Sequence, residues 1–325
     1  MVFKRMLGTF GVGGPSVDTV LAVPSCRPGE RLAGEVRIKA ADYDVEIQRI
    51  SLSLVTRVEV EGADHEQAGG MEFHRVDVSG PFTLPREADR VIAFELDVPW
   101  ETPLTEVYGQ HLHGMVMGVR TELAVAKAVD KGDLDQVAVG PAPSQQRVLD
   151  AFAELGFAFK SADVEYGRIA GVHQELPFYQ EIEFYPPPEH QGRVNEVELT
   201  FVASPHGLAV VLEADKRGGL FTSGGDAFGR FQVSHAEALQ LDWAAEISGW
   251  LHAVADRHGA AFHPGGHGSY EDHHGHGGRG GPGWGTVAAA GAAGVAAGVV
   301  GGMVAGEIAE EVFEEVFEDD EGDED

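Results

Sequence analysis

The feature that most constrains the fold is a tight turn near the amino terminus, between two strand-like segments. The turn reads Pro28-Gly29-Glu30, where proline fixes one backbone angle and glycine permits the conformation beside it. Residues 17–23 precede the turn and residues 32–39 follow it. The chain therefore has to reverse between two half-buried strands, which is typical of the start of a β-sandwich.

Alternation of apolar and polar residues continues through the next hundred positions. Residues 45–60 place Ile50 and Leu52 on one face and Ser51 and Ser53 on the other, as expected for a strand with one face in a core and one in water. Further strands are predicted at residues 73–78, 81–84, 90–98 and 115–126. Short strands separated by Gly and Pro turns predict a sandwich domain over residues 1–133, and the turn-like composition of residues 130–135 marks its end.

A second domain is predicted over residues 134–257. It begins with a helix for which Ser144 is the predicted N-cap and Gly156 the predicted end. One helix from residue 235 to 257 should then lay an apolar stripe against a sheet; the stripe consists of Leu239, Trp243, Ile247, Leu251 and Val254. The strands between the two helices are expected at residues 157–166, 178–185, 194–203, 208–214 and 228–234.

The composition changes abruptly after the second domain. Residues 258–285 are rich in Gly and His and hold too little apolar surface to offset the entropy of ordering, so they are predicted to be a flexible, disordered linker. Residues 286–306 form a segment of Gly, Ala and Val, and residues 307–325 form an acidic tail. The overall prediction is a mainly β protein of two antiparallel sandwiches with short helices, followed by low-complexity segments.

Charge and cysteine content exclude several classes of function. The 325 residues carry a formal net charge of −30, which argues against a DNA- or RNA-binding protein because phosphate recognition needs clustered Lys and Arg. Cys26 is the single cysteine, so neither an internal disulfide nor a cysteine-based zinc site is available. We expect a protein of the reducing cytoplasm, with membrane association as an alternative because of the uncharged segment near the carboxyl end.

Several motifs along the chain resemble those of one bacterial family. They are the Pro28-Gly29-Glu30 turn with Gly34 and Val36, the run from Trp100 to Thr105, residues 118–123 and 130–135, and the strand from Phe178 to Pro186. Together they resemble the sporulation-control family of stage-zero M type, the SpoOM family, over roughly residues 1–255. This resemblance implies two tandem arrestin-like sandwiches and a non-enzymatic regulatory or scaffold role in the cytoplasm through protein contacts. It supplies no catalytic or cofactor-binding residues.

Three groups of side chains are candidates for metal binding. The run His273, His274 and His276 can chelate a transition metal because a flexible backbone lets imidazoles converge, although a low-complexity linker is the simpler interpretation. Asp130, Asp133 and Asp135 hold oxygen ligands suited to calcium, but their spacing is not that of an EF-hand. His111 and His113 would share one face of an extended segment.

The uncharged segment is the candidate for self-association. Gly294, Gly298, Gly302 and Gly306 recur every fourth residue, so on a helix they form a groove in which another helix backbone can lie. Residues 287–306 are also about as long as a bilayer is wide when helical, yet their glycines weaken both helix and insertion. Association with a second copy, membrane contact and disorder therefore remain open for this segment.

Three functional hypotheses follow. The first is a non-enzymatic adaptor that binds protein partners, with strand addition at a sheet edge as one mode. The second is a membrane- or envelope-associated organiser held by residues 287–306. The third is a metal-dependent activity at the histidines of the linker.

Overall fold

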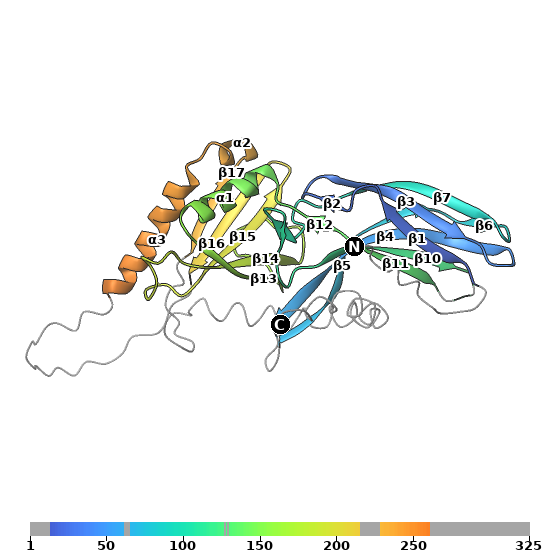
Figure 1. Ribbon diagram of the computed structural model, residues 1–325, viewed down its shortest axis with the longest axis horizontal. Coiled ribbons are helices and arrows are strands. Elements are labelled where there is room, and N and C mark those ends of the chain that lie inside the picture. The colour runs from blue at the N-terminus through green and yellow to red at the C-terminus, as the bar shows by residue number, and fades with distance from the viewer. Residues whose placement is uncertain (1–13, 62–65, 127, 129, 215–227, 261–325) are drawn as a thin grey trace, which may run out of the picture.

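A computed structural model describes residues 14–61, 66–126, 128, 130–214 and 228–260. Its first half is a sandwich of two antiparallel sheets, because alternating residues send one face of each strand into a shared core. The smaller sheet has the order β1-β3-β7, and the larger contains β11, β10 and β4, with β5 and β6 also paired to β4 (Figure 1). Their bounds are β1 Ser16–Leu21, β3 Arg31–Lys39, β4 Val45–Glu61, β5 Glu66–Ser79, β6 Phe82–Leu84, β7 Asp89–Asp97, β10 Met117–Val125 and β11 Lys131–Gln136.

Strand β4 differs from its prediction on the outer face. Ser51 and Ser53 were expected in water, but both are buried. The reason is a neighbouring strand: the Arg75 guanidinium on β5 donates a 2.7 Å hydrogen bond to Ser51 Oγ and forms a 2.9 Å ion pair with Glu122 on β10. Long charged side chains thus lie over this face, so alternation alone does not establish which face meets solvent.

The transition between the two halves lies later than predicted. Residues 130–135 have turn composition, yet residues 131–136 form strand β11, and the short β2 (Ser25–Cys26) pairs in parallel with β12 (Ala138–Val139). The domain boundary placed after residue 133 therefore falls inside a strand of the first unit. Aspartate is tolerated here because its carboxylates cap backbone groups: Asp130 accepts from the Val125 N–H and Asp133 from the Thr19 N–H.

The second unit is one antiparallel sheet with helices on one face. The strands follow the order β13-β14-β15-β16-β17, and a single parallel pair between Glu59 and Glu165 joins β13 to β4 of the first unit. Aromatic contacts seat the helices, since Phe152 lies 4.6 Å from Phe184 between ring centroids. The elements are α1 Pro143–Glu154, β13 Ala158–Tyr166, β14 Phe178–Tyr185, β15 Val197–Ser204, β16 Gly207–Ala214, β17 Gly229–Val233, α2 His235–Ala238 and α3 Trp243–Ala260.

The prediction of a mainly β fold is confirmed. In the described part of the second unit, however, helices lie where the predicted sandwich would have its second sheet. Two details of the helices were predicted wrongly. Helix α1 has Ala142 as its N-cap, because Pro143 takes the first helical position and the Ala142 N–H donates to Gln145 Oε1. Gly156, with φ of +82°, does end the helix as expected.

The predicted helix over residues 235–257 is two helices. The chain breaks after α2, where the Trp243 indole N–H donates a 2.8 Å hydrogen bond to the Ala238 carbonyl and Asp242 accepts from the Ala245 N–H to start α3. The break turns Leu239 away from the predicted stripe, so that Leu239 is 50% exposed while Trp243 is buried. Ile247, Leu251 and Val254 are buried as predicted.

Within the described residues, no helix is both long and apolar enough to cross a bilayer. The predicted linker, the glycine-spaced segment and the acidic tail lie outside the residues that the structure describes, apart from the first residues of the linker, which continue α3 to Ala260.

Candidate functional site

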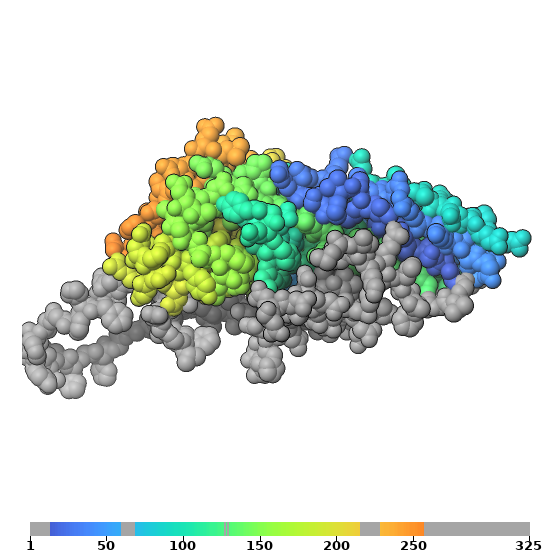
Figure 2. All heavy atoms as spheres, viewed as in Figure 1, coloured from blue at the N-terminus to red at the C-terminus, as the bar shows by residue number. Residues whose placement is uncertain are grey.

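Three of the sequence motifs meet where the two units join. The first contact is between the Pro28-Gly29-Glu30 turn and Trp100, which begins residues 100–105, here called the junction segment. Gly29 has φ of +81°, and a Cβ atom at this position would lie 2.4 Å from the Trp100 indole. Only glycine fits, because both its backbone angle and the space beside it exclude a side chain. In Figure 2 the teal atoms of the chain after β7 lie between the first unit and the green second unit.

Trp100 also contacts the second unit. Its ring lies 5.0 Å from the ring of His235, the first residue of α2. His235 Nε2 donates to the carbonyl of Ser204 at 2.8 Å, so its Nδ1 accepts from the hydroxyl of Ser144 at 2.8 Å. The Ser144 hydroxyl therefore links α1 to α2 by a hydrogen bond, and Ser144 is not the helix cap that the sequence predicted.

The next residue of the junction segment binds the loop between β13 and β14. The Glu101 carboxylate accepts hydrogen bonds from the backbone N–H groups of Glu175 and Leu176, at 2.7 to 2.9 Å. Burial raises the pKa of Glu101, although these two N–H groups oppose the shift. The loop itself is held by the buried Gln174, whose amide nitrogen donates to three carbonyl oxygens, including that of Phe178.

The fourth contact is between the junction segment and strand β14. The amide of Gln180 accepts from the Leu104 N–H at 2.9 Å and donates to the Leu104 carbonyl at 2.8 Å. All of these groups are buried, and the ring of Phe178 packs edge-on against Phe73 of the first unit at 5.4 Å. Paired buried polar groups fix one geometry, because any displacement leaves a donor or acceptor unsatisfied. The two units therefore meet through a specific, rigid contact.

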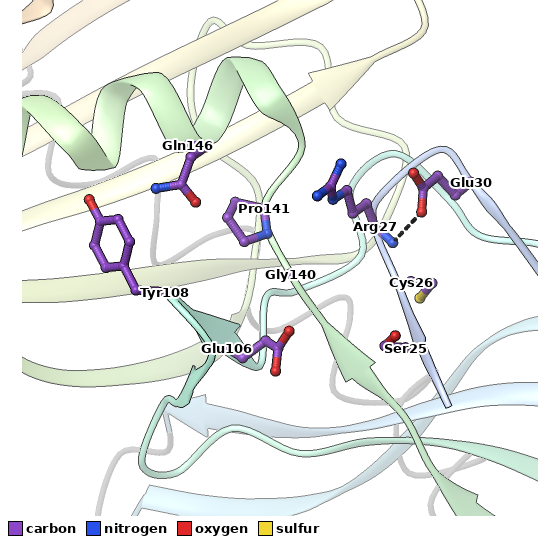
Figure 3. A pocket seen from close by; sticks show the side chains of 10 residues that line it. Ser25, Cys26, Arg27, Glu30, Glu106, Tyr108, Gly140, Pro141 and Gln146 are labelled. Atoms are coloured by element: carbon purple, nitrogen blue, oxygen red, sulfur yellow. Dashed lines mark hydrogen bonds between the residues drawn. The ribbon is translucent and has the colours of Figure 1, made fainter. Parts of the chain in front are cut away.

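A cavity of about 390 Å³ opens beside this contact, and we call it the inner cavity (Figure 3). It is lined by Cys26, Glu30 and Glu106, together with the side chains of Arg27 and Gln146. In Figure 3 the Arg27 side chain extends toward Pro141. Burial raises the pKa of the Cys26 thiol to about 12, so the thiol stays protonated at neutral pH and is a poor nucleophile.

Tyr108 forms one wall of the inner cavity from the tip of a hairpin. The strands are β8 (Glu106–Val107) and β9 (Gln110–His111), and the two turn residues Tyr108 and Gly109 have φ of +55° and +72°. Such angles make a two-residue hairpin turn that costs energy for a tyrosine. The Tyr108 hydroxyl donates a 2.9 Å hydrogen bond to Asp150 on α1. Burial and the Asp150 carboxylate raise the pKa of Tyr108 to about 12.

A second cavity of about 350 Å³ continues from the first, and we call it the outer groove. It shares Arg27, Pro141 and Gln146 with the inner cavity and adds Pro143, Arg147, Asp150 and Leu239. The groove therefore lies between the turn of the first unit and the helices of the second. Leu239 in the outer groove and Tyr108 in the adjoining inner cavity present large exposed surfaces, with exposed fractions of 50% and 59%.

The sheet of the second unit carries a row of acidic side chains. Burial and the neighbouring carboxylates of Glu198 and Asp163 raise the pKa of Glu181 to about 9, and burial together with Glu213 raises that of Glu198 to about 8. Glu183, Glu196 and Glu198 approach closely enough to hold a cation. Lys160 already fills that role, because its ammonium lies 2.7 Å from Glu183 and also pairs with Glu196.

Among the described residues, the predicted trio Asp130, Asp133 and Asp135 does not form a group with metal-binding spacing, and the pair His111 and His113 stays a prediction. The Asp130 and Asp133 carboxylates accept the hydrogen bonds from Val125 and Thr19 named above. The one group with metal-binding spacing among the described residues is Glu183, Glu196 and Glu198, and it includes neither His111 nor His113. His273, His274 and His276, like Gly294, Gly298, Gly302 and Gly306, lie outside the described residues and stay predictions.

Sequence reasoning recognised the junction motifs without assigning them a role, and it missed Tyr108, Arg27 and Arg147. The Tyr-Gly pair at positions 108–109 is a weak turn signal. The two arginines belong to different units, so no local pattern links them.

Comparison with known proteins places these motifs in a family. The sequence pattern of the family described as SpoOM protein matches residues 3–218. The sporulation-control protein spo0M of Bacillus subtilis (strain 168) is 31% identical over 216 residues, which are 66% of this chain and 81% of that protein. The crystal structure of Spo0M, a sporulation control protein from Bacillus subtilis, matches with a TM-score of 0.65 at 28% identity, over 76% of this chain and 100% of that chain.

Proposed function

The chain belongs to the SpoOM family, and from this premise we propose that it is a regulatory protein of sporulation-control type that acts by binding other proteins and not by catalysis. The motif resemblance drawn from the sequence is confirmed by this membership. A cytoplasmic location is part of the proposal and is supported by a fold that uses no disulfide.

The observation that carries the proposal is the outer groove at the junction of the two units. It lies beside the fixed contact between the units, with the exposed Leu239 in its lining and the exposed Tyr108 in the adjoining inner cavity. Aromatic and aliphatic side chains in a preformed groove, with arginines beside them, are the composition of protein-binding sites. A partner that inserts an apolar side chain here would contact both units at once.

The reactive side chains at the junction support binding over catalysis. Ser144 and His235 form a serine–histidine pair, but Ser144 is 2% exposed and its histidine is oriented by a backbone carbonyl. A substrate would have no access to that hydroxyl, and the pair is better explained as a tie between helices. Cys26 is likewise buried and protonated.

The proposal is tested by quantitative affinity capture with the full chain from its source cell. The variants are Leu239→Asp and Tyr108→Ala, with Tyr43→Ala as a matched control because Tyr43 is similarly exposed at 51% and lines neither cavity. We expect a reproducible partner that wild type and the control retain and that Leu239→Asp loses at least tenfold. An identical set of captured proteins for all four chains would refute the groove as the binding site.

A further inference from the structure

Two arginines in the outer groove have guanidinium groups that form no ion pair among the described residues, although the backbone N–H of Arg27 donates to the Glu30 carboxylate. Arg27 comes from the turn before β3 and Arg147 from α1, and both line the groove. Other basic groups of the described chain do form ion pairs, as Arg31 does with Glu95 and Asp97. The chain holds 53 Asp and Glu against 23 Lys and Arg, so a groove lined by two arginines and one aspartate differs in charge from the chain as a whole.

The remaining lining of the outer groove is mostly apolar. Pro141, Pro143 and the half-exposed Leu239 provide its hydrophobic surface. The single carboxylate, Asp150, already accepts hydrogen bonds from Tyr108 at 2.9 Å and Gln146 at 2.7 Å. The groove thus presents a positive, apolar surface, which is complementary to a segment that is both acidic and apolar.

The carboxyl-terminal tail of the same chain has this composition. Residues 307–325 contain twelve acidic residues and neither Lys nor Arg. Its larger apolar residues include pairs four positions apart, Ile308 with Val312, Val312 with Val316 and Phe313 with Phe317, and such pairs would share one side of a helix. An amphipathic acidic helix laid in a groove is a recurring mode of peptide recognition.

The tether is long enough for the tail to reach the groove of its own molecule. Leu239 lies four residues before α3, and the 18 residues of α3 extend about 27 Å from there. Residues 261–306 then provide 46 positions, for which a Gly-rich chain has a root-mean-square span of roughly 37 Å. This span is longer than the roughly 27 Å length of α3, so a flexible tether of this length would give the tail a local concentration at the groove on the order of millimolar.

We propose that residues 307–317 dock in the outer groove of the same molecule, with their apolar face on Leu239 and the two prolines and their carboxylates facing Arg27 and Arg147. The docking itself is independent of the function proposed above. Its consequence rests on that function: the tail would be an intramolecular competitor that lowers the affinity for a protein partner until the partner displaces it.

The test is photo-crosslinking in the full-length protein, with p-benzoylphenylalanine in place of Phe313. We expect cross-links to residues 141–150 and to Leu239, identified by mass spectrometry of the monomer. The yield should fall at least fivefold in 1 M NaCl, because salt screens exposed charge pairs. Cross-links distributed over the molecule, or confined to another surface, would overturn the proposal.

Charge variants provide the matched controls. Arg27→Glu with Arg147→Glu should lower the groove cross-links at least fivefold, whereas Arg27→Lys with Arg147→Lys should retain most of them. The pair Arg57→Glu and Arg86→Glu changes two exposed arginines outside both cavities and should have no effect. Equal loss in both glutamate pairs would show a general charge effect and refute the docking site.

An equal mixture of isotopically heavy and light chains distinguishes docking within one molecule from docking between two. Heavy–light cross-links at the groove would assign the tail to a second copy and overturn the intramolecular proposal. Since the readout needs no partner protein, failure of this test leaves the affinity capture with Leu239→Asp as a separate test of the proposed function.

Discussion

Replacing Gly29 by alanine tests whether the first turn is bound to the junction between the units. An alanine would hold φ near +81°, which costs about 1–2 kcal/mol for a residue with a Cβ. Its Cβ would lie 2.4 Å from the Trp100 indole, well over 1 Å inside normal van der Waals contact. Trp100 has little freedom to move, because it packs against His235, whose ring is fixed by two hydrogen bonds.

Overpacking of this kind costs about 1–3 kcal/mol, so Gly29→Ala should lower the free energy of unfolding by about 2–5 kcal/mol in total. Urea unfolding followed by far-ultraviolet circular dichroism measures it. Gly109→Ala is the matched control, since Gly109 has φ of +72° but no atom within 4 Å of the added Cβ. It should show the backbone cost alone, about 1–2 kcal/mol.

A double-mutant cycle with Trp100→Leu separates the two causes. In the leucine background, Gly29→Ala should cost no more than the control, which gives a coupling free energy of about 1–3 kcal/mol between the two sites. Additive effects within about 0.5 kcal/mol would show that the indole does not oppose the added methyl group and would refute the reasoning.

Three further changes probe the rest of the junction and the sheet. Gln180→Leu should lower the free energy of urea unfolding by about 2–4 kcal/mol, because it leaves the buried N–H and carbonyl of Leu104 unpaired; a loss below about 1 kcal/mol would contradict this. The pKa of Glu181 is raised to about 9 in the folded state. Between about pH 4 and pH 9 the folded protein therefore keeps a proton that the unfolded chain releases. The contribution of Glu181 to the free energy of unfolding falls as the pH rises through this range. Glu181→Gln should therefore raise the thermal midpoint at pH 8 and leave it almost unchanged at pH 4, and equal shifts at both values would contradict the assignment. Tyr108→Phe removes a hydrogen bond to Asp150 at an exposed site and should lower the unfolding free energy by less than about 1 kcal/mol; a loss above 2 kcal/mol would show that this bond is essential to the junction.

Strand positions were predictable from the sequence because apolar and polar residues alternate with a period of two along a strand, and this period does not depend on which element packs on each face. The strand predicted at residues 178–185 coincides with β14, and that at residues 45–60 with β4 apart from one residue. Which face meets water was not predictable for β4. Ser51 is buried by an arginine from β5, and the pairing partner of a strand is not encoded in the strand.

Breaks were harder to predict than periodic segments. The aspartates of residues 130–135 have the composition of a turn, but their carboxylates bond to backbone groups of neighbouring strands and the segment pairs as β11. The helix over residues 235–257 reads as continuous because Leu239 fits its stripe, yet the Trp243 indole bonds to Ala238 and a new helix starts. In both places a side chain satisfies a backbone group, and local propensity does not report such contacts.

The sequence by itself determined the mainly β class, the family and the reversal of the chain at the first turn. Those properties depend on local backbone angles and on periodicity, which short windows of residues contain. Only the tertiary structure decided that Gly29, Trp100, Leu104 and Gln180 form one contact, and that Arg27 and Arg147 line one groove beside it. These residues come from segments up to about 150 positions apart, and their proximity depends on how two units pack, which is a property of the folded chain and not of any one segment.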